Sequence, residues 1–95
     1  MAEKILKIQN KLGLHARAAA KLVQTAVKFK SEVKLARVDS GAGSQETEVN
    51  AKSIMGVLML AAARGTTVKV SAQGEDEQAA VDALVALIDS KFGEE

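Results

Sequence analysis

The chain has 95 residues, a formal net charge of +1 and no cysteine. This length suits one core, so we expect residues 1–95 to fold as a single domain. The weak charge and the lack of Trp and Tyr argue against nucleic-acid binding. No apolar run approaches the roughly 20 residues of a membrane span, and the N-terminus is charged, so we expect no membrane insertion and a cytoplasmic location.

The first part of the chain predicts a strand, a helix and a second strand. Apolar and polar residues alternate over 4–9 and again over 32–37, which is the period of a half-buried strand. Between them, residues 16–29 have the period of an amphipathic helix. The apolar face of this helix comprises Ala19, Leu22, Val23 and Ala26.

The middle of the chain predicts a hairpin and a short helix. Residues 39–48 are rich in Gly and Ser and form the expected hairpin connection, which a third strand follows at Val49. Ser53 is a favoured N-cap for a helix that we expect to end after Arg64, at Gly65.

The last part predicts one strand and one helix. Residues 66–72 alternate clearly, and the helix that follows opens with acids over 75–77, which suit its positive end. The inner face of this helix comprises Val81, Leu84, Val85, Ile88 and Phe92. The order strand–helix–strand–strand–helix–strand–helix predicts an α+β fold with helices covering one face of a sheet.

A candidate site lies in GLHARAAAKLV (13–23), where the only histidine, His15, stands at the start of the first helix. The first N–H groups of a helix have no partner within it, and the helix dipole is positive there, so anions bind. Arg17 adds a guanidinium suited to phosphate oxygens. This environment favours a neutral, nucleophilic imidazole, which can accept a phosphoryl group covalently.

Simpler interpretations of His15 compete with this one. A polar residue before a helix is usually only a cap or a solvated side chain. A metal site would need carboxylate partners, and a catalytic triad would need a serine and an acid, but the sequence places neither set beside His15. We therefore expect no metal site and no cofactor.

A second feature is NAKSIMGVLML (50–60), in which Ser53 precedes a short helix with an unusually broad apolar surface. A short helix cannot bury every side, so part of this surface is left for a partner, and Met gives adaptable contacts. The competing interpretations are plain capping by Ser53 and plain core packing. The apolar surface comprises Ile54, Met55, Leu58 and Met59.

Together these segments resemble the histidine-containing phosphocarrier (HPr) family of the bacterial phosphoenolpyruvate-dependent phosphotransferase system. NKLGLHARAAAKLV (10–23) resembles its phosphorylation site, and KSIMGVLMLAAARGTTVKVSAQGEDEQAA (52–80) resembles its regulatory region, the next strand and the last helix. The resemblance implies an open-faced β-sandwich, a four-stranded antiparallel sheet covered on one face by three helices. It also implies that His15 accepts a phosphoryl group at Nδ1 from phosphorylated enzyme I and passes it to EIIA-type acceptor proteins for sugar uptake. Arg17 would help to hold the phosphate.

The resemblance further implies a regulatory serine and a partner face. Ser53 takes the place of a serine that a dedicated HPr kinase/phosphorylase modifies in some bacteria. Phosphate at this N-cap would suit the helix dipole but would put roughly two negative charges beside the partner face. We expect a monomeric carrier rather than an enzyme. Its implied partner face comprises Ala16, Arg17, Ala20, Gln24, Val27, Ile54, Met55, Leu58 and Met59.

Two departures from the family pattern stand out. Ala18 replaces the usual proline, a change that we expect to alter the rate of the chemistry without abolishing it. The segment 39–48 is longer than the usual hairpin of the family. The register of the third strand is therefore the part of the fold that the sequence defines least. Two alternatives stay open: a regulatory interaction module of the nitrogen-related branch with little or no role in sugar transport, and a small-ligand-binding domain in which His15 has no function.

Overall fold

The computed structural model describes residues 1–38, 47–60 and 64–93. Within these ranges the order of strands and helices is the predicted one, with a short 3-10 turn added after the last helix. The elements are β1 (Ala2–Lys7), α1 (Ala16–Ala26), β2 (Glu32–Arg37), β3 (Thr47–Asn50), α2 (Ile54–Met59), β4 (Thr67–Gln73), α3 (Glu77–Asp89) and η1 (Lys91–Gly93).

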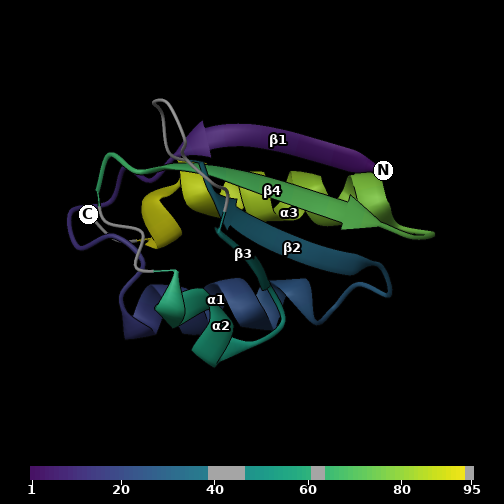
Figure 1. Cartoon of the computed structure of the whole chain (residues 1–95), viewed down its shortest axis with the longest axis horizontal. Helices are drawn as coiled ribbons and strands as arrows, with labels where there is room; N and C mark the ends of the chain where they lie inside the picture. Colours follow the sequence, from purple (N-terminus) through teal and green to yellow (C-terminus); the bar gives the residue numbers. More distant parts are fainter. Residues whose placement is uncertain (39–46, 61–63, 94–95) are drawn as a thin grey trace.

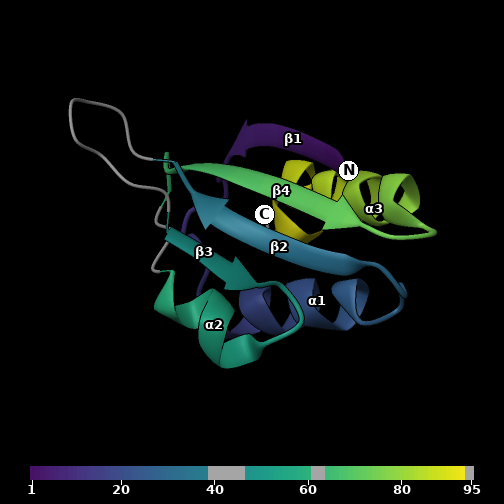
Figure 2. The same ribbon diagram turned by 45° about the vertical axis from the view of Figure 1, so that its right-hand side comes forward.

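The strands form one sheet in the order β1-β4-β2-β3, and each neighbouring pair is antiparallel. The three α-helices lie on one side of this sheet, with α1 and α2 side by side and α3 behind β4 and β1 (Figures 1 and 2). The other face carries no helix in the described part of the chain. The expected open-faced α+β arrangement is therefore confirmed.

The core lies between the sheet and the helices because side chains alternate along the strands. Val33 and Leu35 of β2 and Val68 and Val70 of β4 are buried on the helix side. Helix residues fill the other half of this core. They are Ala18, Ala19, Leu22, Ala26, Val57, Ala80, Val81, Leu84 and Ile88.

The first two elements differ from the prediction at their ends. β1 spans Ala2–Lys7 rather than 4–9 because it pairs with β4 from Ala2 opposite Ala72 to Lys7 opposite Thr67. Ile8 then leaves the strand and is fully buried. α1 ends at Ala26 rather than 29, since the N–H groups of Lys28 and Phe29 donate to carbonyls three residues back and form tighter turns.

The later elements also differ from the prediction at their ends. α2 ends at Met59, short of the predicted end at Gly65, and residues 61–63 lie outside the described ranges. α3 begins at Glu77, after the first two predicted acids. Of the predicted hairpin, residues 39–46 also lie outside the described ranges, but β3 is present and pairs with β2 from Lys34 opposite Asn50 to Arg37 opposite Thr47.

Candidate phosphorylation site

His15 is the N-cap residue of α1, with an extended backbone (φ −80°, ψ 179°). Its Nδ1 atom accepts the backbone N–H of Arg17 at 3.3 Å, and its carbonyl oxygen accepts the N–H of Ala19 at 2.8 Å. The ring is half-buried. The Nδ1 lone pair is therefore directed at the positive start of the helix, where orphan N–H groups favour an anion.

A tight turn before the helix positions this ring. The N–H of Gly13 donates to the carbonyl of Asn10 at 3.1 Å, and Asn10 Nδ2 donates back to the carbonyl of Gly13 at 2.7 Å. Gly13 has a φ of +65°, a left-handed conformation that a side chain would disfavour. Leu14, the residue immediately before His15, is buried and anchors this turn in the core. The turn and the buried Leu14 together fix the position of His15 at the start of α1.

The first turn of α1 is rich in groups that suit a phosphate. Arg17 is exposed two residues after His15, and its guanidinium is a group that suits phosphate oxygens. Among the residues that the structure describes, the N–H groups of Ala16 and Ala18 donate to no acceptor. Ala18 is completely buried, so its side chain packs beneath the cap rather than beside a ligand. Neither α1 nor α2 contains an acidic residue.

Ser53 is the N-cap of α2, as predicted. Its Oγ accepts the N–H of Gly56 at 3.1 Å, and its carbonyl accepts the N–H of Val57 at 3.0 Å. The residue is half-buried, so capping is a role that the hydroxyl already performs.

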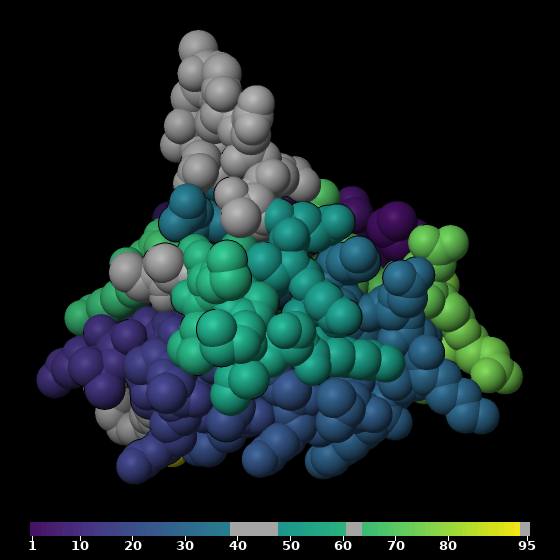
Figure 3. All heavy atoms as spheres, turned by 60° about the horizontal axis from the view of Figure 1, so that its bottom comes forward, coloured from purple at the N-terminus to yellow at the C-terminus, as the bar shows by residue number. Residues whose placement is uncertain are grey.

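The residues predicted for the partner face lie on α1 and α2, which run side by side, and at Val27, the C-cap of α1. We call this surface the docking face (Figure 3). Its large exposed side chains include Met59, of which 74% is accessible. Two members of the docking face, Ala20 and Leu58, are half-buried rather than exposed, and Leu58 packs against the core. The exposed members are Ala16, Arg17, Gln24, Val27, Ile54, Met55 and Met59.

Sequence reasoning missed one exposed residue next to the site. Leu12 lies in the turn that precedes His15 and leaves 69% of its surface accessible. The signal was present, because a large apolar residue between Lys11 and Gly13 has no strand or helix period to bury it. Leu12 is therefore an exposed apolar side chain three residues before His15.

In the described ranges, no three His, Cys, Asp or Glu side chains gather closely enough to hold a metal ion. Over the same residues, no helix has the length and apolar character required to cross a bilayer.

Comparison with known proteins assigns the family. The family model for the PTS HPr component phosphorylation site matches residues 2–90. The phosphocarrier protein HPr of Cupriavidus necator is 53% identical over 94 residues, covering 99% of this chain and 98% of that relative. A phosphocarrier protein NPr from Shewanella violacea is 41% identical over 92 residues, covering 97% of this chain and 93% of that relative.

Solved structures agree with this assignment. The crystal structure of HPr-C-His from Thermoanaerobacter tengcongensis has a TM-score of 0.85 and 50% identity, covering 100% of this chain and 99% of that chain. These matches define a small phosphocarrier. The chain belongs to the HPr family of the phosphotransferase system, and its function is to carry phosphoryl groups within that system.

Proposed function

We propose that His15 is the residue that carries the phosphoryl group, accepting it from phosphorylated enzyme I and passing it to EIIA-type acceptor proteins. The observation that supports this most directly is the contact of 3.3 Å between Nδ1 and the N–H of Arg17. It aims a nucleophilic lone pair at a helix start built to receive negative charge.

The transfer is a displacement at phosphorus. The Nδ1 lone pair of His15 forms the new P–N bond while the bond from phosphorus to its carrier atom on enzyme I breaks, and that atom keeps the electron pair. The Arg17 N–H then exchanges its imidazole acceptor for a phosphoryl oxygen, and the Arg17 guanidinium offers a second set of donors. Passing the group to the acceptor reverses these steps. On this proposal the chain is a covalent intermediate rather than an enzyme.

The docking face suits partners that are acidic as well as apolar. Its helices contain no acidic residue, and Arg17 lies at one end of an apolar surface that includes Met55 and Met59. Complementary acidic groups on enzyme I and the EIIA-type proteins would speed encounter and orient His15 toward their phosphorylation sites.

Ser53 is proposed as a regulatory phosphorylation site for a partner of the HPr kinase/phosphorylase type. A phosphate on Oγ would stay at the positive end of α2, so it would not unfold the helix. It would also place negative charge beside Ile54 and Met55, which are exposed on the docking face. Ser53→Asp is expected to slow phosphorylation by enzyme I while leaving the melting temperature nearly unchanged.

The deciding experiment is incubation with phosphoenolpyruvate and enzyme I, followed by mass mapping. We expect one acid-labile, alkali-stable phosphoryl adduct on His15, absent in His15→Ala. Ser53→Ala serves as the matched control and should be labelled like the parent protein. Unaltered labelling of His15→Ala would exclude the proposed site.

A cytoplasmic monomer built from one domain, residues 1–95, completes the proposal. The HPr of Thermoanaerobacter tengcongensis has been crystallised as a dimer, so association must be measured for this chain. Elution at the monomer mass over a hundredfold range of concentration would agree with the proposal, whereas a concentration-independent dimer would contradict it.

The similarity to an NPr protein supports a second candidate, a carrier of the nitrogen-related branch with little or no role in sugar transport. The discriminating measurement is the rate of phosphorylation by the enzyme I of each branch. Faster transfer from the nitrogen-branch enzyme would favour this second function.

A further inference from the structure

A cavity of about 310 Å³ opens at the end of the sheet where β1 finishes and β4 begins. Among the described residues that line it, three are cationic and none is acidic. The lining residues are Lys7, Ile8, Gln9, Arg64, Gly65 and Lys91. Because like charges repel, three cations facing one cavity favour an anion between them.

The backbone holds two walls of this cavity in place. Lys7 is the last residue of β1 and is paired with Thr67 of β4. The N–H of Ile8 donates to the carbonyl of Thr66 at 2.9 Å, and the N–H of Gly65 donates to the carbonyl of Ile8 at 2.7 Å. Lys7 and the segment that carries Arg64 are therefore joined through the main chain.

The third wall depends on an unusual backbone conformation. Lys91 and Phe92 both have a φ of +58°, the left-handed region that side chains disfavour. Phe92 is completely buried, and its carbonyl accepts Lys21 Nζ at 2.6 Å. The core and α1 thus hold the strained turn that brings Lys91 to the cavity. Such strain in a native fold is a recognised mark of functional sites.

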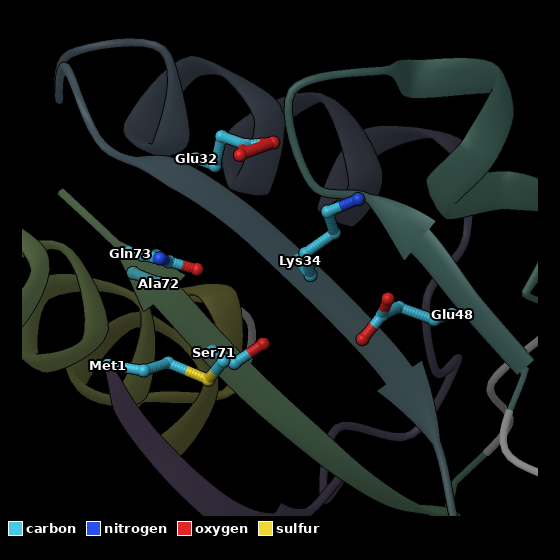
Figure 4. A pocket seen from close by; sticks show the side chains of 7 residues that line it. All are labelled: Met1, Glu32, Lys34, Glu48, Ser71, Ala72 and Gln73. Carbon is cyan, nitrogen blue, oxygen red and sulfur yellow. The ribbon is translucent and has the colours of Figure 1, made fainter.

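Two other cavities show how different this charge balance is. A cavity of about 200 Å³ on the open face of the sheet has Lys34 between Glu32 and Glu48 (Figure 4). A cavity of about 120 Å³ near the start of β2 is lined by Lys30, Lys34 and Lys52, but Glu32 is there too. In the first, the carboxylates outnumber the cation, and in the second one carboxylate offsets part of the charge of three lysines.

We propose that the cavity formed by Lys7, Arg64 and Lys91 binds a small soluble anion that bears phosphate groups. Arg64 supplies a planar fork for two phosphate oxygens, the two lysines supply point charges, and the amide of Gln9 adds a neutral donor. Several oxygens on one ligand can engage cations from three separate segments, so a diphosphate fits better than a monoanion. This site is separate from the start of α1, and the proposal does not depend on the role of His15.

The test is a titration of ¹⁵N-labelled protein with sodium pyrophosphate, followed by the backbone amide signals. We expect saturable shifts at Ile8, Gln9, Gly65 and Thr66, and weaker binding of sodium acetate. Lys7→Gln/Arg64→Gln should raise the dissociation constant at least about tenfold, because two charge-assisted contacts are lost.

The matched control is Lys30→Gln/Lys34→Gln, which removes the same charge from the cavity of about 120 Å³ near the start of β2. It should change the dissociation constant by less than about twofold, since distant exposed charges are screened. Equal weakening by the two double variants would overturn the proposal. Shifts confined to residues 16–18 would also overturn it, because pyrophosphate would then bind at the start of α1.

A phosphate group can also belong to a lipid. Sedimentation with phosphatidylglycerol vesicles separates the two sources. Vesicle binding that Lys7→Gln/Arg64→Gln abolishes, with no saturable binding of pyrophosphate, would overturn the assignment to a soluble anion. Pyrophosphate binding without vesicle binding would support it.

Discussion

The N-terminal ends of α1 and α3 use opposite solutions to the same problem of unpaired N–H groups. At α1, the Nδ1 atom of His15 accepts the N–H of Arg17 at 3.3 Å. At α3, the carboxylate of the N-cap residue Asp76 makes no bond to its own helix. It accepts the N–H groups of Lys30 and Ser31, each at 2.9 Å, and the hydroxyl of Ser31.

The electrostatics of the α3 end follow from these bonds. The hydroxyl of Ser31, and next the N–H of Lys30, lower the pKa of Asp76 to about 2. Glu77 accepts the N–H of Gly74 at 3.1 Å and pairs with the N-terminal amine of Met1 at 3.0 Å. These two contacts, the N–H of Gly74 first, also lower the pKa of Glu77.

The difference shows what each end is for. Two carboxylates already occupy the start of α3. Asp76 ties it to the turn before β2, and Glu77 binds the N–H of Gly74 and the N-terminal amine, so this end stabilises the fold. The first turn of α1 carries no carboxylate and has an exposed Arg17, which fits the proposal that its positive end receives a phosphoryl group. A helix start that must receive phosphate cannot carry its own carboxylate.

The largest expected effect breaks the α3 end. Gly74 has a φ of +150°, and a Cβ there would lie 2.7 Å from Ser31 Cα, so Gly74→Ala must displace the backbone that Asp76 binds. We expect a loss of about 3 kcal/mol in the free energy of unfolding, measured by urea denaturation. Gly65→Ala is the control: its φ is +89° but nothing lies within 4 Å, so the cost should be only about 1 kcal/mol. Equal losses would show that the contact with Ser31 is unimportant.

The next effect sharpens the role of the α1 end. Arg17→Gln is expected to slow phosphoryl transfer from enzyme I by about a hundredfold, because a charged donor beside the transferring group is lost. The transfer rate of Arg17→Lys should lie between those of the parent protein and Arg17→Gln, since lysine keeps the charge but not the planar fork of donors. Rapid-quench kinetics measure both rates. Lys28→Gln, an exposed cation just beyond α1, is the control, and an equal loss there would reduce Arg17 to a general electrostatic role.

A smaller effect is the pH dependence of the stability that Asp76 gives to the α3 end. Asp76 has a folded pKa of about 2 against an ordinary value of 3.8, so its bonds stabilise the fold at pH values above the ordinary value. This stabilisation is lost as the pH falls from the ordinary value through the folded one. The difference in urea midpoint between the parent protein and Asp76→Asn should therefore be largest near neutral pH and vanish at the acid end. A difference that does not change with pH would contradict the assignment.

The smallest effect concerns the departure at Ala18. Its N–H donates to no acceptor in the described part of the chain, so Ala18→Pro should stabilise the protein by about 0.5–1 kcal/mol through the unfolded state. The contrasting variant is Ala19→Pro, which removes the bond of 2.8 Å to the carbonyl of His15 and should cost about 3 kcal/mol. Thermal melting of both variants gives the comparison. Destabilisation by Ala18→Pro would mean that the buried site cannot hold the ring.

Local features were predictable because they depend on neighbours in sequence. The order of elements and the inward faces of β2 and β4 follow from apolar periodicity. The cap at Ser53 follows from a short polar side chain before a helical run, and the place of His15 follows from the run of helix formers after it. The ends of β1 did not follow, since the pairing with β4, from Ala2 opposite Ala72, sets them.

The sequence alone therefore determined the α+β order, the start of α1 and the candidate phosphoryl acceptor, because each rests on contacts within a few residues. Only the tertiary structure decided where the carboxylate of Asp76 binds, because its partners Lys30 and Ser31 lie 46 and 45 residues away. It also brought Lys7, Arg64 and Lys91 around one cavity. No local sequence pattern specifies these long-range contacts, because they form when strand pairing and core packing bring distant segments together.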